Sequence, residues 1–523
     1  MSLAEPFNFP EWTEYSSTSG QDPLGMQSTS INLYQSLVPG IGNVTLRMRY
    51  YGLYAWLSQS YARRVGDTNP KSWQRYIRRT EALYALIAAR RGGETGVAGG
   101  NWARRKLSKV AKGSIDFSRD AELERPNYFA VTWGAYGLAY GSQLSQVRIL
   151  CETAAHGIPV PSEGAGEKLA TAFEQELGEL AAPFQRSIER ARVTHSDLER
   201  FGRLSPSGIR KTGAERSLYE DVLFARDGLG GDDADSRRAS LVLILKLTAQ
   251  LKRSPTPDDV RWVLYAGKDG NGQPFYAGGA ALQNQQRRWH DYHANDLCHV
   301  TLEALLKFTL DKLGEYPRGI AAQVLIRRCA DDIAGTGTAP ASWGAFVRAV
   351  AEAPNAYDAQ SGASEWNLAQ EMLAASGALE ICSADTALKA LVLLALLHRR
   401  FRADSGAATS ELAQFDPVAF HSLLTESRFL DQLTEEPFAR AVARILEERV
   451  MRRHLWVAMR KLRHQGDYTF LVDTDDGLLR LRKKDGPIFT NPRLGPAIRF
   501  LRDIHLIDDD GLTPRGAKVL QSS

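Results

Sequence analysis

Residues 286–313 read QRRWHDYHANDLCHVTLEALLKFTLDKL, and this stretch decides the fold class of the chain. It contains neither glycine nor proline, and its apolar side chains recur at the spacing of a helix rather than alternating as in a strand. We therefore expect one long helix. The same periodicity predicts further helices on the C-terminal side, at residues 320–332, 341–351, 365–376 and 387–401.

The N-terminal side of this helix is also mainly helical by pattern. Helical spacing predicts helices at residues 46–61 and 73–87, within 128–154 and within 167–192. One stretch differs, because residues 262–266 and 274–276 flank the turn sequence Asp269-Gly270-Asn271-Gly272 and predict a short β-hairpin. The first 43 residues, rich in Ser, Gly, Pro and aromatic side chains, predict an irregular arm.

The C-terminal end changes character. Residues 438–464 predict one basic helix, 468–472 and 478–482 predict strands, and helices follow at 493–504 and from Thr513. This mixture suggests a winged-helix-like domain, a class that often docks a helix in a DNA groove. The predicted fold is thus a mainly α, multidomain protein with a small C-terminal α+β domain. Its expected domains are a basic, aromatic-rich domain at 1–160, helical domains at 161–345 and 346–437, and the winged-helix-like domain at 438–523.

Composition restricts the class of protein. The hydrophobic fraction of 43% and the charged fraction of 24% are those of an ordinary globular chain. The four cysteines form no CxxC pair, which argues against a zinc ribbon or a disulfide framework and favours a reducing compartment. With no secretory leader and no apolar run long enough to cross a bilayer, we expect a cytoplasmic protein without a membrane partner.

The charges are unevenly distributed although the net charge is only +4. Residues 44–112 hold 15 Lys and Arg against three acids, and residues 438–523 hold 17 against 11. Two basic regions therefore flank an acidic middle.

The segment from Arg47 to Lys112 combines arginines, which bind phosphate bidentately, with many tyrosines and tryptophans. This predicts nucleic-acid binding, with DNA favoured over RNA. Two alternatives remain: the aromatics form a core while the arginines pair with acids of this chain or of a partner, or the segment meets a membrane surface. The predicted nucleic-acid-binding residues are Arg47, Arg49, Lys71, Arg75, Arg78, Arg79, Arg104, Arg105 and Lys106.

The long helix carries a second cluster. His293, Asp296 and Glu303 share one helical face, and imidazole beside carboxylate can ligate a metal. The alternative is that these groups hydrogen-bond neighbouring helices, and we predict neither a metal nor a cofactor. No GxxxxGK[ST], GxGxxG, GxSxG or HExxH motif is present, so the sequence names no reaction.

Arg288, followed after four residues by His293, resembles the Arg-x4–6-His signature of the helical HEPN ribonucleases. The resemblance implies that the arginine would stabilise phosphate charge and the histidine would move a proton. Family members usually have a polar residue directly after the arginine, where this chain has Trp289.

Two segments resemble an uncharacterised family of bacterial proteins, some of which lie near phage-defence and restriction genes. The first contains Asp22-Pro23-Leu24-Gly25, Pro39-Gly40 and Thr45-Leu46-Arg47-Met48-Arg49-Tyr50, similar to the family's Asp-x-Leu-Gly, Pro-Gly and Thr-x-Arg-x-Arg-Tyr pattern. The second runs from Arg288 to Leu305. The resemblance covers under a fifth of the chain and implies a defence setting.

The function expected from the sequence is a nucleic-acid-binding component of a bacterial anti-phage defence or restriction-type system, with protein partners from a multi-gene system. The first alternative is a helical nuclease, HEPN-like or metal-dependent, around Arg288 and His293. The second is a scaffold subunit whose basic regions bind an acidic protein partner.

Overall fold

The computed structural model describes residues 22–110, 113–122, 128–153, 155–337, 340–403, 410–417 and 420–522. As predicted, the protein is mainly helical, with a few short strands. The predicted arm falls partly outside the described residues, which begin at Asp22. Among the described residues, no helix has the length and apolar character needed to span a membrane.

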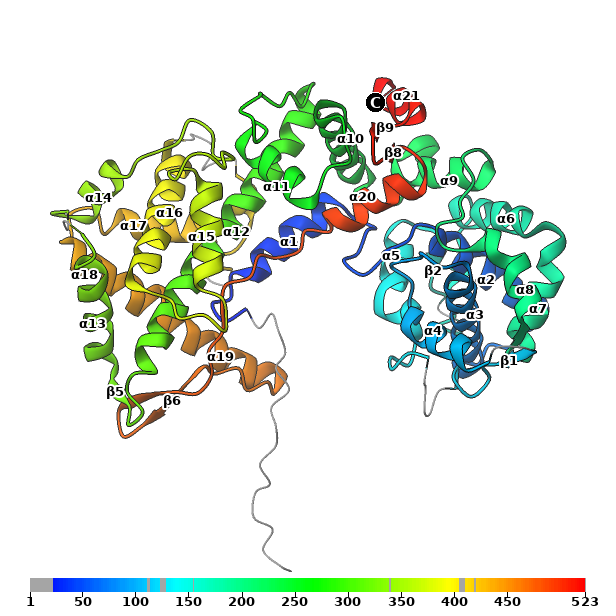
Figure 1. Ribbon diagram of the computed structural model, residues 1–523, viewed down its shortest axis with the longest axis horizontal. Coiled ribbons are helices and arrows are strands. Elements are labelled where there is room, and N and C mark those ends of the chain that lie inside the picture. Colours follow the sequence, from blue (N-terminus) through cyan, green and yellow to red (C-terminus); the bar gives the residue numbers. More distant parts are fainter. Residues whose placement is uncertain are drawn as a thin grey trace, which may run out of the picture.

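The helices gather into two lobes joined by a bridge (Figure 1). The first lobe contains α2 (Arg49–Arg64), α3 (Pro70–Arg91), α4 (Gly100–Lys109), α5 (Gly141–Gln146), α6 (Ala165–Leu177), α7 (Ala181–Arg190), α8 (His195–Phe201) and α9 (Ala214–Leu223). Two small antiparallel pairs, β1–β4 (Ser114–Asp116 and Arg192–Thr194) and β2–β3 (Leu150–Cys151 and Val160–Pro161), tie its loops together. α6 packs on α2, so this lobe crosses the domain boundary expected at residue 160.

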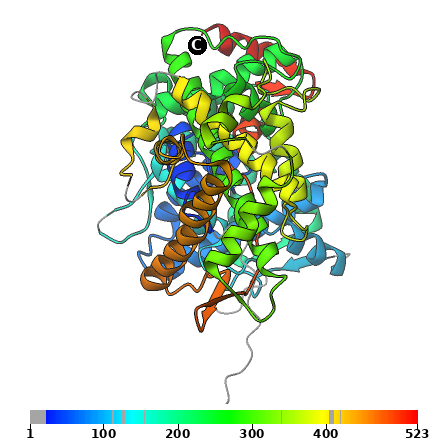
Figure 2. The same cartoon turned by 90° about the vertical axis from the view of Figure 1, so that its left-hand side faces the viewer.

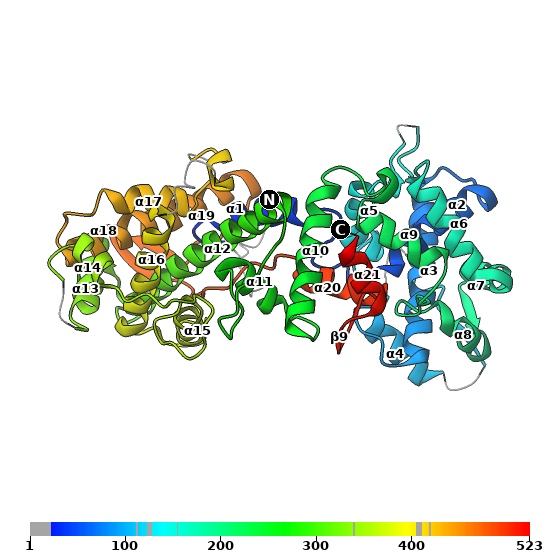
Figure 3. The same ribbon diagram turned by 90° about the horizontal axis from the view of Figure 1, so that it is seen from above.

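The second lobe is built around α12 (Ala280–Leu313), a helix of 34 residues that continues into it from the bridge (Figure 3). From Asp291 to Asp311 every side chain of α12 is buried. A helix buried on all sides needs partners all round, and the other members of the lobe supply them. They are α13 (Ala322–Ala334), α14 (Trp343–Ala349), α15 (Glu365–Ala375), α16 (Ala384–Ala403), α17 (Leu423–Asp431), α18 (Phe438–Arg444), α19 (Arg452–Gln465) and a sheet of order β5–β7–β6 (Ile320–Ala321, Leu478–Leu481 and Val472–Asp475).

The bridge combines segments far apart in the sequence. It contains α1 (Gln27–Leu37), α10 (Ala234–Leu251), α11 (Pro257–Ala266), α20 (Leu494–Asp503), β8–β9 (Ile507–Asp508 and Gly511–Leu512) and α21 (Pro514–Gln521). α10 packs on α12, α1 and α21, while α20 packs on α11. The bridge therefore fixes the two lobes relative to each other.

The hairpin predicted at 262–276 is wrong. Residues 262–266 belong to α11, which starts at a capping box between Thr256 and Asp259 with Pro257 at the first helical position. The turn after it does form, but it carries only an isolated bridge between Lys268 and Pro274. The helix predicted within 128–154 is also shorter than expected, because a π-helical stretch, Tyr136–Tyr140, and α5 account for its helical part.

The C-terminal helices and strands form much as predicted, with a π-helical stretch, Ile445–Met451, between α18 and α19. β6 pairs with β7 and β8 with β9, but other contacts lead to the rest of the chain. β7 pairs with β5 of the second lobe, α20 packs on α11, and α21 packs on α10. Figure 2 shows this dispersal, with α19 and the β6–β7 hairpin low on the second lobe and the red C-terminal end at the top. The described residues of 438–523 thus include a small strand-containing region, as predicted, but their packing does not confirm a winged helix.

Candidate nucleic-acid interface

Arg49 and Arg78, two of the predicted phosphate-binding residues, are buried, so the expectation that they face solvent is wrong. Arg49 forms a bidentate ion pair with Glu215, with Nε–Oε1 and Nη2–Oε2 distances of 2.9 and 3.0 Å. Arg78 donates to four backbone carbonyls, those of Ala121, Phe129, Val131 and Thr132. Both guanidinium groups hold the first lobe together, because a buried cation must be paired or fully hydrogen-bonded.

Other predicted residues are also engaged by the protein. Arg47 is nearly buried, its Nη1 lies 2.7 Å from Asp503 Oδ1, and its Nε donates to the Thr95 carbonyl. Lys106 pairs with Asp120 at 2.6 Å, and Arg79 donates to a backbone carbonyl of α7. Arg47 therefore fastens α20 to the first lobe, which brings the two basic regions of the sequence together.

The aromatic side chains beside these arginines form the core of the first lobe. Tyr50, Tyr51, Tyr54 and Trp56 are each no more than 2% exposed, and the ring of Tyr50 stacks on that of Tyr140 at 4.7 Å. The alternative in which the aromatics are core is therefore confirmed. They cannot stack on bases from this position.

The remaining predicted cations are exposed. Lys71 and Arg75 lie on the first half of α3, where Arg75 is 3.8 Å from Glu122. Arg104 and Arg105 lie on α4 and line a hollow. Only part of the predicted set thus remains available to a ligand.

Two open hollows lie on either side of Glu94, in the loop between α3 and α4. One, of about 860 Å³, is lined by Arg90, Arg91, Arg203, Arg210 and His505. The other, of about 550 Å³, is lined by residues 94–102, Arg104 and Arg105, together with Tyr128 and Phe129. Arg499 of α20 reaches the rim of the second hollow and donates to Thr95 Oγ1. We call this surface the basic groove and define it by Arg90, Arg91, Arg104, Arg105, Arg203, Arg210, Arg499 and His505.

Part of the positive charge in the basic groove is not neutralised. Arg90, Arg91 and Arg210 pair with Glu199, Glu94 and Glu176. Among the described residues, Arg104, Arg105, Arg203 and Arg499 have no carboxylate within ion-pair distance. Partial burial lowers the pKa of Arg499, and the neighbouring cations Arg47 and Arg502 lower it further. A polyanion would relieve this repulsion.

Six members of the basic groove were not predicted: Arg90, Arg91, Arg203, Arg210, Arg499 and His505. Arg90 and Arg91 lie inside the basic segment, just before the glycine that ends α3. Their position at the end of a basic helix could have identified them from the sequence. The others come from segments more than 100 and 400 residues away. Only the packing of α20 and of the loop after α8 brings them to α3.

The face of α12 with His293, Asp296 and Glu303, considered above as able to ligate a metal, carries an internal ion-pair network. Asp296 accepts hydrogen bonds from the Thr490 hydroxyl and amide, and His299 lies between Asp296 and Glu303, with Nε2 2.9 Å from Glu303 Oε1. Burial alone would lower the pKa of His299, but the two carboxylates outweigh it and raise that pKa well above its ordinary value. Within the described ranges, no group of three or more His, Cys, Asp or Glu side chains is placed to hold a metal ion.

Arg288 and His293 do not meet. The Arg288 guanidinium donates to Ser36 and Ser236 on the α1 and α10 side. The His293 ring lies against α11, with its centroid 4.5 Å from that of Trp262, and neither ring nitrogen has a hydrogen-bond partner among the described residues. Burial lowers the pKa of His293 far below its usual value, so the imidazole is neutral. The pair that resembles a HEPN motif is not assembled around a common point.

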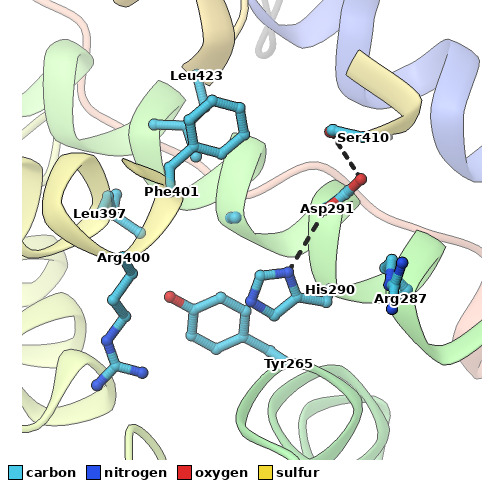
Figure 4. A pocket seen from close by; sticks show the side chains of 10 residues that line it. Tyr265, Arg287, His290, Asp291, Leu397, Arg400, Phe401, Ser410 and Leu423 are labelled. Atoms are coloured by element: carbon cyan, nitrogen blue, oxygen red, sulfur yellow. Dashed lines mark hydrogen bonds and ion pairs between the residues drawn. The ribbon is translucent and has the colours of Figure 1, made fainter. Parts of the chain in front are cut away.

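A small cavity lies beside this part of α12, between α11 and α16 (Figure 4). The Tyr265 ring stacks on His290 with centroids 5.0 Å apart, and Asp291 accepts a 2.8 Å hydrogen bond from Ser410. Arg400 points away from His290 and pairs with Glu365 at 2.9 Å. The cavity measures about 60 Å³, the volume of about two water molecules. It therefore gives no room for a substrate of ordinary size.

The basic groove is thus the surface of the described chain with the clearest ligand chemistry. No protein-family model, curated protein or solved structure matches the chain.

Proposed function

We propose that this protein binds nucleic acid through the phosphate backbone, at the basic groove. One observation carries the proposal: cations from residues 90–105, 203–210 and 499–505 meet around two open hollows, and four of the arginines have no carboxylate partner among the described residues. Arginine matches phosphate geometry, and its neutralisation of phosphates releases counterions whatever the base sequence. The resemblance to a family found near defence genes favours a role as a component of a bacterial anti-phage defence or restriction-type system, with DNA favoured over RNA.

The four unpaired arginines set the expected salt dependence. If each contacts one phosphate of duplex DNA, the logarithm of affinity falls with the logarithm of salt concentration with a slope of about −4. A fourfold rise in salt then weakens binding roughly 200-fold. Binding of an acidic protein, the scaffold alternative, releases no condensed counterion atmosphere and gives a shallower slope.

The test is fluorescence anisotropy with labelled duplex DNA, single-stranded DNA and RNA over a salt series. The groove variant carries Arg104→Glu, Arg105→Glu and Arg499→Glu. A matched control reverses three exposed arginines of the second lobe: Arg318, Arg327 and Arg348.

We expect the control to bind like the unaltered protein and the groove variant to lose binding at low salt. Equal binding by the two variants, or no binding of any probe by the unaltered protein, would refute the proposal.

A further inference from the structure

α19 turns an unusual face to solvent. Its exposed positions Arg452, Trp456, Met459 and Arg463 follow the spacing of one helical face, and Leu462 lies beside them. Trp456 is 45% exposed and Met459 48% exposed. The face therefore combines large apolar side chains with arginines at both ends.

The buried face of α19 holds Val457 and Ala458, and with them two polar side chains, Arg453 and His454. Arg453 pairs with Glu426 at 2.6 Å in the interior, and His454 hydrogen-bonds the backbone at Pro23 and Leu471. A helix that packed only for stability would bury its tryptophan and expose its arginine. Adjacent exposed apolar side chains of this kind mark a binding surface.

The charge around this face favours a polyanion. Residues 452–465 contain no acid. The Arg460 guanidinium lies over the Trp456 ring, 4.7 Å from its centroid. Tyr468 lies in the loop after the helix and is 46% exposed. The Arg482 guanidinium lies over its ring, 4.1 Å from the ring centroid. Both aromatic rings are thus exposed next to guanidinium groups.

We propose that the exposed face of α19, with Trp456 at its centre, is a stacking platform for single-stranded nucleic acid. The bases of a single strand expose their faces, and a base stacks on Trp456 while the neighbouring arginines contact phosphates. A duplex hides those faces and gains little from the platform. This inference rests on the proposed function and deepens it: the basic groove binds phosphates of either form, and the platform selects unpaired strands.

The test compares Trp456→Ala and Trp456→Phe with the unaltered protein, using one oligonucleotide as a single strand and as a duplex. Leu379→Ala serves as the control, since it removes another highly exposed apolar side chain, which lies on a loop and not on α19. Loss of one stacked base lowers affinity by about 5- to 150-fold. We expect that loss for the single strand with Trp456→Ala, near-normal affinity with Trp456→Phe, and an unchanged affinity for the duplex.

Each other outcome overturns the platform. Unchanged single-strand binding by Trp456→Ala does so, and so does an equal loss for both probes. Trp456-dependent binding of an acidic peptide with unchanged single-strand binding would assign α19 to a protein partner instead. Failure of the unaltered protein to bind either probe would refute the proposed function, whereas binding of both probes with a single-strand affinity that does not depend on Trp456 would refute the platform alone.

Discussion

Acidification is expected to loosen α19, because His454 holds this helix only as a neutral imidazole. Nε2 of His454 accepts a 2.9 Å hydrogen bond from the Leu471 N–H, so it carries no proton. The ring proton therefore belongs on Nδ1, which lies 3.2 Å from the Pro23 carbonyl oxygen. Adding a second proton would place a donor against the Leu471 N–H. Burial, together with the Lys461 cation, lowers the pKa of His454 from 6.5 to about 4, although the Pro23 carbonyl partly opposes this.

The pKa in the folded state is depressed, so the stabilisation is complete above pH 6.5 and is lost as the pH falls from 6.5 to 4. A difference of about 2.5 pH units corresponds to about 3 kcal/mol. Hydrogen–deuterium exchange of peptides from 452–471, corrected for intrinsic rates, measures this loss as reduced protection. His454→Gln removes the titrating group and should flatten the dependence.

His421 needs a control of its own, because burial also lowers its pKa to about 4 and its ring contacts Trp456. The His421→Gln protein should keep most of the pH dependence. The reasoning fails if His454→Gln loses protection over this pH range as steeply as the unaltered protein.

Two further predictions concern the first lobe. Glu215→Ala leaves the Arg49 guanidinium buried without its carboxylate, so we expect a loss of about 3–5 kcal/mol in unfolding free energy; a thermal shift no larger than that of an exposed substitution would contradict this. Gly52→Ala puts a methyl group 2.2 Å from the Tyr219 hydroxyl and should cost about 1–3 kcal/mol, although alanine is the better helix former. Adding Tyr219→Phe should recover part of that stability in chemical denaturation, and a stabilising Gly52→Ala would be the refuting result.

Much of the fold could be predicted where local signals were strong. The stretch 286–313 has no helix breaker and is helical throughout. The only difference is that the helix begins a few residues earlier, at Ala280. The hairpin prediction was wrong because it relied on the glycines of the turn. It overlooked the capping box at Thr256 and Asp259, which starts a helix. The winged helix is not confirmed for a different reason: the strand and helix types were right and β6 pairs with β7, but β7, α20 and α21 also pack on distant parts of the chain.

The candidate site was harder to predict because burial depends on distant loops. Arg75 and Arg78 both lie opposite the apolar stripe of α3, so helical periodicity predicts that both side chains face solvent. In the structure Arg75 is exposed, whereas the segment around Phe129 and Val131 covers Arg78. Charge counts correctly marked two basic regions, but no local pattern showed that α20 would lie against the first.

The contact between the Met48 amide and the Asp503 carboxylate joins groups 455 residues apart. During translation, the first lobe leaves the ribosome long before α20 has been made, so its Met48 N–H and the aromatic surface at Tyr51 that later receives Phe500 stay uncovered on the nascent chain. Contacts of such high sequence separation slow folding and prolong exposure of apolar surface. We therefore expect this surface to stay open to aggregation on the growing polypeptide until synthesis has passed residue 503.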